Sequence, residues 1–392
     1  MYNIENVTIV SNRSANLLRE GVVCNYLEKL EESKRDCHAS LNVFSKNFPS
    51  GEVYAQFPEN LRAKNVHIIA GFYRPDLYYL RRKIVNSNLD LNSKGEIIEN
   101  YMNSLETDLR ELEKIGDAAR RSGCESISVY LTYYPDARQD KKDEPRVPIS
   151  AKLTMDNLVS SFTPSLKRFG TIDIHSQQIQ GFTNYPVDHI TVKPFFILYI
   201  RYLFGSLDNV VLISPDAGGA KDIQKLSKEY GIPYAISEKI RPEHGKSIVN
   251  VKGNVKDKIA VIIDDIIDGG GTIIEATEAL RNEGAKDVIA FATNGVFSTK
   301  LKRNKGGEVE DIIFAEDSLR KANIKIGITD TIGRIPHYYK EHDFLLRPIT
   351  VSPLIADLIY CNESGYSHGE KLSKYINMAK KEDPKLLEEF LL

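Results

Sequence analysis

The residues best suited to bind a ligand are acidic or small, and they lie where a buried strand is followed by a helix. The strand is the apolar, largely β-branched run Ile259–Ile263, and aspartates, glycines and a threonine follow it. Backbone N–H groups at a helix N-terminus can bind a phosphate, and adjacent carboxylates can bind sugar hydroxyls or hydrated Mg²⁺. The residues that we predict to bind a sugar phosphate are Asp264, Asp265, Asp268, Gly269, Gly270, Gly271 and Thr272.

A second loop of the same kind follows the apolar run Val210–Ser214. A serine and an aspartate lie at the end of this strand, and two glycines precede the helical pattern that begins near Lys221. Parallel strands end at one edge of a sheet, which is where open α/β sheets bind their ligands. Two such loops could therefore hold two phosphorylated groups. The residues of this second loop are Ser214, Asp216, Ala217, Gly218 and Gly219.

Three further polar segments contain residues that could act on such ligands. Asp173 and His175 end the strand pattern Thr171–Ile174, and an imidazole there could ligate Mg²⁺ or contact a phosphate, although a lone histidine is more often structural. The charged segment Tyr134–Lys152 precedes an apolar helical pattern and would by itself be a solvated loop. The cationic segment Ser237–His244 could close over anionic substrates or be an exposed turn.

Length and composition restrict the class of protein. The 392 residues are enough for two α/β domains, and the net charge of −2 gives no basic surface for nucleic acid. Neither a signal-peptide pattern nor a membrane-length apolar run occurs. Four scattered cysteines without a Cys-x-x-Cys pair are typical of a reducing compartment, so we expect a cytoplasmic protein. The cysteines are Cys24, Cys37, Cys124 and Cys361.

Short apolar strands alternate with helical patterns, which favours an α/β fold with doubly wound, mostly parallel sheets. We expect the boundary between the two halves near Val187 to Lys193. The predicted strands are Val7–Val10, Val66–Ala70, Ile127–Thr132 and Thr171–Ile174 in the first half, and Val210–Ser214, Tyr234–Ser237, Ile259–Ile263, Val288–Thr293 and Ile312–Ala315 in the second.

The segment from about Arg74 to Asn103 has a different composition, rich in Asn, Arg and Tyr. It leads into a predicted amphipathic helix whose apolar stripe is Ile98, Tyr101, Leu105, Leu109, Leu112 and Ile115. We interpret it as a surface excursion packed by one helical face, with an oligomer contact as the alternative.

The loops resemble, in order, those of the ribose-phosphate pyrophosphokinases, also called phosphoribosyl pyrophosphate synthetases. The segment around Asp264 is similar to the ribose-5-phosphate loop of the type I phosphoribosyltransferase fold, with Gly269 where that loop most often has threonine. The loop after Ser214 resembles the family's pyrophosphate loop. The resemblance covers about residues 40 to 370, whereas the segment near 74–103 and the tail after Lys371 lie outside the usual pattern.

This resemblance implies two phosphoribosyltransferase-like α/β domains, each with a central, mostly parallel sheet flanked by helices. They would be residues 1–190 and 191–345, and residues 346–392 would pack back on the first domain. It also implies roles for single residues: Mg²⁺ ligands at His175 and Asp216; ATP contacts at Arg138, Gln139 and Asp143; adenine-side contacts from a neighbouring subunit at Phe48, Ser50 and Glu52; and transition-state stabilisers at Lys239 and Arg241.

The implied reaction transfers the diphosphoryl group of MgATP to the C1 hydroxyl of ribose 5-phosphate and gives 5-phospho-α-D-ribose 1-diphosphate and AMP. The resemblance also implies a homo-oligomer, a dimer or a hexamer, with no nucleic acid or membrane partner. Because Gly269 removes a hydroxyl from the sugar phosphate loop, we expect weaker phosphate binding there. The alternatives are a non-catalytic regulatory homologue and, less favoured, a phosphoribosyltransferase. Arg62 could be an inherited regulatory position.

Overall fold

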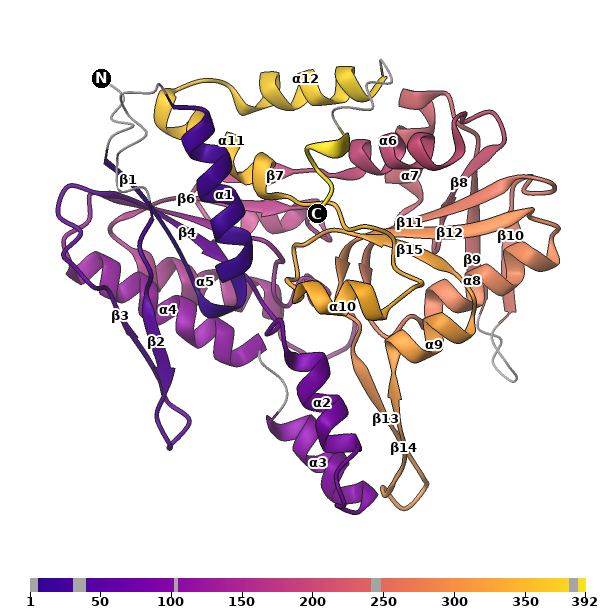
Figure 1. Cartoon of the computed structure of the whole chain (residues 1–392), viewed down its shortest axis with the longest axis horizontal. Coiled ribbons are helices and arrows are strands. Elements are labelled where there is room, and N and C mark those ends of the chain that lie inside the picture. The colour runs from indigo at the N-terminus through magenta and orange to yellow at the C-terminus, as the bar shows by residue number, and fades with distance from the viewer. Residues whose placement is uncertain (1–5, 31–39, 102–104, 241–247, 381–386) are drawn as a thin grey trace.

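Two sheets with their covering helices organise the chain in the computed structural model, which describes residues 6–30, 40–101, 105–240, 248–380 and 387–392. Within these residues the first sheet has five strands in the order β1-β4-β5-β6-β7, and every neighbouring pair is parallel. Strands β1, β4 and β5 are almost wholly buried, because helices cover both faces (Figure 1). The bounds are β1 (Val7–Ser11), β4 (Asn65–Ala70), β5 (Ser126–Leu131), β6 (Leu166–Ile172) and β7 (Val187–Ile190).

The second sheet has six strands among the described residues, in the order β10-β9-β8-β11-β12-β15. All neighbours are parallel except β9 and β10. From β8 the chain moves outward through β9 and β10, then returns to place β11 on the other side of β8. The order therefore reverses between β8 and β11, which is the switch point where open α/β sheets bind ligands. The bounds are β8 (Val210–Ser214), β9 (Tyr234–Ile240), β10 (Ile248–Lys252), β11 (Ile259–Ile267), β12 (Asp287–Gly295) and β15 (Lys325–Ile328).

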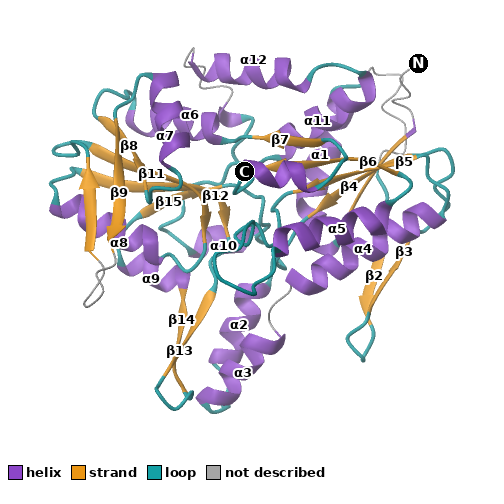
Figure 2. Ribbon diagram, turned by 180° about the vertical axis from the view of Figure 1, so that it is seen from behind, coloured by secondary structure: helices purple, strands orange, loops and turns teal. Residues whose placement is uncertain are grey.

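Helices cover both faces of each sheet (Figures 1 and 2). On the first sheet, α1 and α11 pack together on one face, while α4 and α5 cover the other. On the second sheet, α6 and α7 lie opposite α8 and α9. The bounds of these helices and of α10 and α12 are α1 (Asn16–Glu28), α4 (Leu105–Arg121), α5 (Ser150–Phe162), α6 (Lys193–Phe204), α7 (Ala220–Tyr230), α8 (Gly271–Asn282), α9 (Ala315–Lys321), α10 (Pro336–Glu341), α11 (Ser352–Ser364) and α12 (His368–Lys380). Two 3-10 helices, Arg13–Ala15 and Gln177–Phe182, follow β1 and β6.

One hydrophobic core runs through both halves of the molecule. It combines Ile9 and Ile172 of the first sheet with Leu212 and Val261 of the second, together with residues of helix α6. Residues Phe195 to Ile200 of α6 are all buried in this core. Burial of apolar surface contributes about 25 cal/mol per Å² to stability, so a shared core fixes the two sheets relative to each other.

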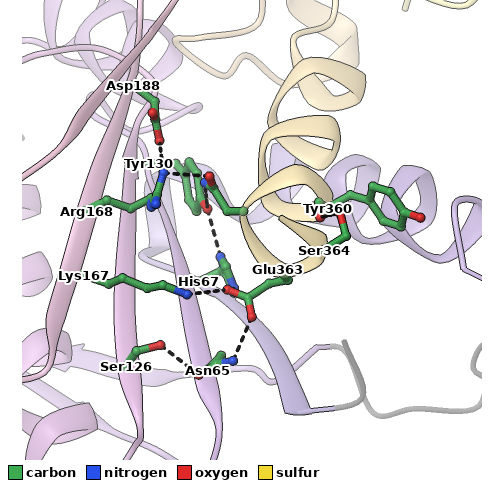
Figure 3. Close-up of polar contacts among 11 residues, drawn as sticks. Asn65, His67, Ser126, Tyr130, Lys167, Arg168, Asp188, Tyr360, Glu363 and Ser364 are labelled. Atoms are coloured by element: carbon green, nitrogen blue, oxygen red, sulfur yellow. Dashed lines mark hydrogen bonds and ion pairs between the residues drawn. The ribbon is translucent and has the colours of Figure 1, made fainter. Parts of the chain in front are cut away.

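Helix α11 is anchored on the first sheet by a buried carboxylate, Glu363. Figure 3 shows its side chain among Asn65, His67 and Lys167 on the strands beneath. Asn65 Nδ2 donates to Glu363 at 2.8 Å, and His67 Nε2 and Lys167 Nζ each lie 3.3 Å from Oε1. Burial alone would raise the pKa of Glu363, but His67 and Lys167 lower it to about 2. The C-terminal part of the chain is thus tied to the first sheet by charge as well as by packing.

Two features project from the same side of the molecule (Figures 1 and 2). One is the hairpin β2 (Phe44–Asn47) and β3 (Val53–Gln56). The other, which we call the arm, joins α2 (Leu77–Val85) and α3 (Leu91–Tyr101) to the hairpin β13 (Thr299–Arg303) and β14 (Val309–Phe314). The arm has a small core of its own, composed of Ile98, Val309, Ile312 and Phe314.

Several predicted elements differ from the structure. The strand predicted at Ile312–Ala315 is present as β14, which ends at Phe314, but it does not join the parallel sheet. It pairs with β13, its apolar side chains pack in the arm, and β15 lies next to β12 in the sheet. The single helix predicted from Ile98 to Ile115 is two helices, because Ile98 packs in the arm whereas Ile115 packs in the core of the first sheet. Strand β6 begins earlier than predicted and ends before Asp173, whose φ of 37° does not fit a strand.

Candidate active site

The sugar phosphate loop lies at the carboxyl end of β11, beside the switch point of the second sheet. Strand β11 is longer than the apolar run, so Asp264 and Asp265 belong to the strand itself. Gly270 then adopts a φ of +77°, and a Cβ at this position would lie 2.9 Å from Leu319 Cδ2. Both the backbone angle and the space therefore require glycine there. Helix α8 begins at Gly271, so the N–H groups of its first turn have no partner within the helix and could bind an anion at this loop.

The two adjacent carboxylates of β11 have opposite electrostatic states. Burial, followed by the neighbouring Asp265, raises the pKa of Asp264 well above its ordinary value, and Asp216 adds to this effect. Burial would also raise the pKa of Asp265, but hydrogen bonds from His175 and Asp264 outweigh it and lower that pKa. The pair thus offers one group that can donate a hydrogen bond and one that accepts, which suits the vicinal hydroxyls of a sugar.

Two ion pairs connect the loops of the first sheet to the sugar phosphate loop. His175, after β6, places Nδ1 2.5 Å from Asp265 Oδ2. Arg138, in the loop after β5, donates from Nη1 to Asp268 Oδ2 at 2.8 Å. The hydrogen bond with Asp265 raises the pKa of His175, against the opposing effect of burial. Residues from both sheets that the sequence marks separately therefore lie together in one site.

The donor set at this site fits a Mg²⁺ ion that keeps most of its ligands as water and substrate oxygens. His175 is held through Nδ1 by a carboxylate, the arrangement that commonly orients a metal-binding imidazole. The charge of Asp216 contributes to the raised pKa of Asp264, so a cation here would relieve repulsion between carboxylates. In the described part of the chain no three His, Cys, Asp or Glu side chains group into a metal cage. Mg²⁺ does not need one, because one or two protein ligands with substrate phosphates suffice.

The second phosphate loop follows β8 and faces the same switch point. Ser214 Oγ donates to the carbonyl of Asp216 at 2.7 Å, and Gly219 N donates to Asp216 Oδ1 at 3.0 Å. A Cβ at Gly218 would lie 3.2 Å from Asp216 Oδ1, and one at Gly219 would lie 3.0 Å from Ser214 Oγ. The glycines therefore allow a tight turn ahead of α7, in which Ala217 and Gly218 are exposed.

The other predicted site residues lie in different elements or outside the described residues. Phe48, Ser50 and Glu52 occupy the turn of the projecting β2–β3 hairpin, where Ser50 Oγ donates to Glu52 at 2.9 Å and Phe48 is 42% exposed. Lys239 lies in β9 opposite Val249, and Arg241 lies outside the described residues. Gln139 accepts a hydrogen bond from Ser150, and Asp143 is exposed.

The structure adds residues to the site that carry no sequence motif. Lys193, the first residue of α6, places Nζ 2.5 Å from Asp222 Oδ2, directly after the second phosphate loop. Burial would lower the pKa of Lys193, but Asp173 and Asp222 outweigh it and raise that pKa. Tyr73 lies near Asp268, and burial together with this carboxylate raises its pKa to about 12. In the sequence, only the position of Lys193 at the domain boundary could have suggested a role.

Comparisons with known proteins agree with this geometry. The family model described as the N-terminal domain of ribose phosphate pyrophosphokinase matches residues 8–161, and the phosphoribosyl transferase domain matches residues 193–313. The ribose-phosphate pyrophosphokinase of Aquifex aeolicus is 34% identical over 322 residues, which is 82% of this chain and 87% of that protein. The enzyme of the same name from Campylobacter jejuni is 34% identical over 324 residues, which is 81% of this chain and 88% of that protein.

A solved structure agrees as well. The crystal structure of phosphoribosylpyrophosphate synthetase from Mycobacterium smegmatis aligns with a TM-score of 0.71 and 27% identity, covering 92% of this chain and 99% of that one. The fold and the site thus define an α/β enzyme built from two phosphoribosyltransferase-type domains, as the sequence predicted. The chain belongs to the ribose-phosphate pyrophosphokinase family, which confirms the resemblance. Among the described helices, none has the length and apolar character needed to span a bilayer.

Proposed function

We propose that this enzyme transfers the β,γ-diphosphoryl group of MgATP to the C1 hydroxyl of ribose 5-phosphate. The C1 oxygen forms a bond to the β-phosphorus, the bond to the α,β-bridging oxygen breaks, AMP leaves and the hydroxyl proton is released. The carrying observation is that two phosphate loops flank the switch point of the second sheet while His175 and Arg138 reach them from the first. Family membership supports the same reaction class.

Each loop then has a role in positioning. Asp264 and Asp265 hold the ribose hydroxyls, N–H groups of the loop from Asp268 to Thr272 hold the 5-phosphate, and the loop after Ser214 holds the diphosphoryl group. His175 and Asp216 would hold Mg²⁺, which when bound supplies charge neutralisation for the transferring group. This chemistry requires mainly in-line alignment and fixed positive charge, both of which these loops can provide.

The remaining roles come from the family resemblance. Arg138, with Gln139 and Asp143, would contact ATP, and its planar guanidinium suits both stacking and phosphate binding. Lys239 and Arg241 would stabilise the transition state. Phe48, at the exposed hairpin turn, would pack on the adenine bound by a neighbouring subunit, so we also propose a homo-oligomer. The described cysteines Cys24, Cys124 and Cys361 are free thiols, which supports a cytoplasmic location.

The test is AMP formation from MgATP with and without ribose 5-phosphate, combined with phosphorus NMR of the sugar product. We expect AMP only when the sugar phosphate is present, together with a diphosphate signal at C1. A second candidate, a non-catalytic homologue that regulates an active synthetase, is favoured by Gly269 alone. Binding of both substrates without turnover would favour that candidate.

A further inference from the structure

A groove of about 350 Å³ lies between the arm and the sugar phosphate loop. Asp268 and Ser298 line it from the loop side, and Arg81 and Arg303 line it from the arm. Thr299, the first residue of β13, lies in the groove where the arm leaves the second sheet. The arm therefore forms one wall of a space that opens directly onto the predicted 5-phosphate site.

The position of Arg81 in this groove is fixed by the packing of α2. Its Nη1 lies 3.5 Å from Thr299 Oγ1. The next residue, Arg82, places Nη2 2.5 Å from Asp317 and its guanidinium 3.8 Å from the centre of the Phe314 ring. These contacts hold the helix on the hairpin and α9, so the guanidinium of Arg81 does not have to be ordered when a ligand binds.

The charges around the groove favour an anion. Both of its carboxylates are paired, Asp268 with Arg138 from outside the groove at 2.8 Å and Glu99 with Arg303 of the groove itself at 2.6 Å. Burial lowers the pKa of Arg81 and the nearby Glu316 opposes this effect, while an arginine stays protonated in proteins. Glu316 itself accepts a hydrogen bond from the Tyr338 hydroxyl at 2.9 Å and does not line the groove.

The loop is open toward the groove at one position. A Cβ built on Gly269 would have Ser298 Oγ as its nearest neighbour, at 3.9 Å, so no side chain separates the loop backbone from this hydroxyl. A phosphate seated on the N–H groups ahead of α8 can therefore face Ser298 and the cation beyond it. Guanidinium and hydroxyl groups are common partners of phosphate oxygens.

We propose that Arg81 is a further substrate-binding residue, whose guanidinium contacts the 5-phosphate of the sugar phosphate from the arm side, with Ser298 beside it. The ligand class is a pentose phosphate monoester, because a sugar without the phosphate has no group to place in the groove. This inference rests on the proposed function, since it takes the loop from Asp268 to Thr272 as the 5-phosphate site.

The experiment measures binding of ribose 5-phosphate to the full chain by calorimetry, in parallel with AMP formation. We expect Arg81→Gln to raise the Kd for ribose 5-phosphate about 10- to 100-fold, the usual effect of losing a hydrogen bond to a charged group. Arg81→Lys should recover part of the loss. Lys83→Gln is the matched control, because it removes a positive charge from an exposed position of the same helix outside the groove, and it should change this Kd by less than about twofold.

The outcomes separate this inference from the proposed function. A wild-type chain that neither binds ribose 5-phosphate nor makes AMP overturns both. An active wild type with unchanged sugar phosphate binding in Arg81→Gln overturns only the role of Arg81. Equal losses of affinity for ATP and for ribose 5-phosphate would show that Arg81 has only a structural role in α2, and would also overturn its role in phosphate binding. If Arg81→Gln unfolds, Ser298→Ala tests the same groove, with an expected loss of about 2- to 10-fold for the sugar phosphate and none for ATP.

Discussion

At the scale of single residues, charged groups predicted to bind substrates bind each other across the two sheets. His175 pairs with Asp265, and Arg138 pairs with Asp268. These pairs compensate the charges of Asp265 and Asp268, and a sugar phosphate that binds to these carboxylates would compete with the pairs. The Arg138–Asp268 pair is exposed, and exposed ion pairs contribute little to stability, so breaking this pair costs little free energy.

Asp265→Asn should change both ligand binding and the titration of its partner. Without the carboxylate, the effect of burial remains, so the pKa of His175 should fall below its wild-type value. Binding of ribose 5-phosphate should weaken about tenfold or more, because a charged hydrogen-bond partner is lost. NMR titration of the His175 ring checks the first expectation, with Asp268→Asn as the control that keeps the His175 contact. An unchanged pKa would contradict the assignment.

Gly269→Thr should be tolerated and should improve sugar phosphate binding. The position has no positive φ, and the added Cβ would approach nothing closer than 3.9 Å. One new hydroxyl hydrogen bond corresponds to a KM for ribose 5-phosphate about 2- to 10-fold lower. Gly269→Ala tests the effect of the added carbon without the hydroxyl, and it should leave the KM for ribose 5-phosphate unchanged. Gly270→Ala should instead destabilise the loop, because its Cβ would contact Leu319 and its φ is +77°.

At the scale of elements, the docking of α11 on the first sheet should depend on pH. The pKa of Glu363 is lower in the folded chain, so its stabilising effect is complete above about pH 4.5 and is lost as the pH falls toward 2. The shift corresponds to about 3 kcal/mol at neutral pH. Glu363→Gln should therefore lower the free energy of unfolding at pH 7, and its difference from wild type should shrink below pH 4.5. Chemical denaturation measures this, with the exposed Glu278→Gln as the control; a difference independent of pH would contradict it.

At the scale of the whole molecule, the projecting β2–β3 hairpin should complete the site of a neighbouring subunit. Phe48→Ala then damages the partner's site, whereas Asp265→Ala damages its own. In a mixed dimer, the Phe48→Ala subunit keeps an intact Asp265 and receives an intact Phe48. Co-expression with random pairing should restore about a quarter of wild-type activity. AMP formation by the mixed sample, compared with each variant alone, checks this. No recovery would place Phe48 in its own subunit's site or outside any site.

The sequence predicted those strands and helices whose pattern depends only on consecutive residues. The strands around Val210 and Ile259 are buried, β-branched runs followed by glycine-containing turns, so type and position could be read directly. The strand β15, Lys325–Ile328, is short and has glycine in its centre, and no pattern distinguished it. Ile312 and Phe314 looked like sheet residues because their pattern fits any buried strand, and only packing against Ile98 assigns them to the arm.

Local sequence patterns identified the family and predicted the two phosphate loops and most of the charged residues around them, because each of these signals occupies a few consecutive residues. Only the tertiary structure decided which of them meet: Arg138 with Asp268, His175 with Asp265, and Arg81 with the groove beside Gly269. In the two ion pairs, the partners are separated by 90 residues or more along the chain. Their contact depends on the angle and distance between two sheets, which the shared core sets and which no local pattern encodes.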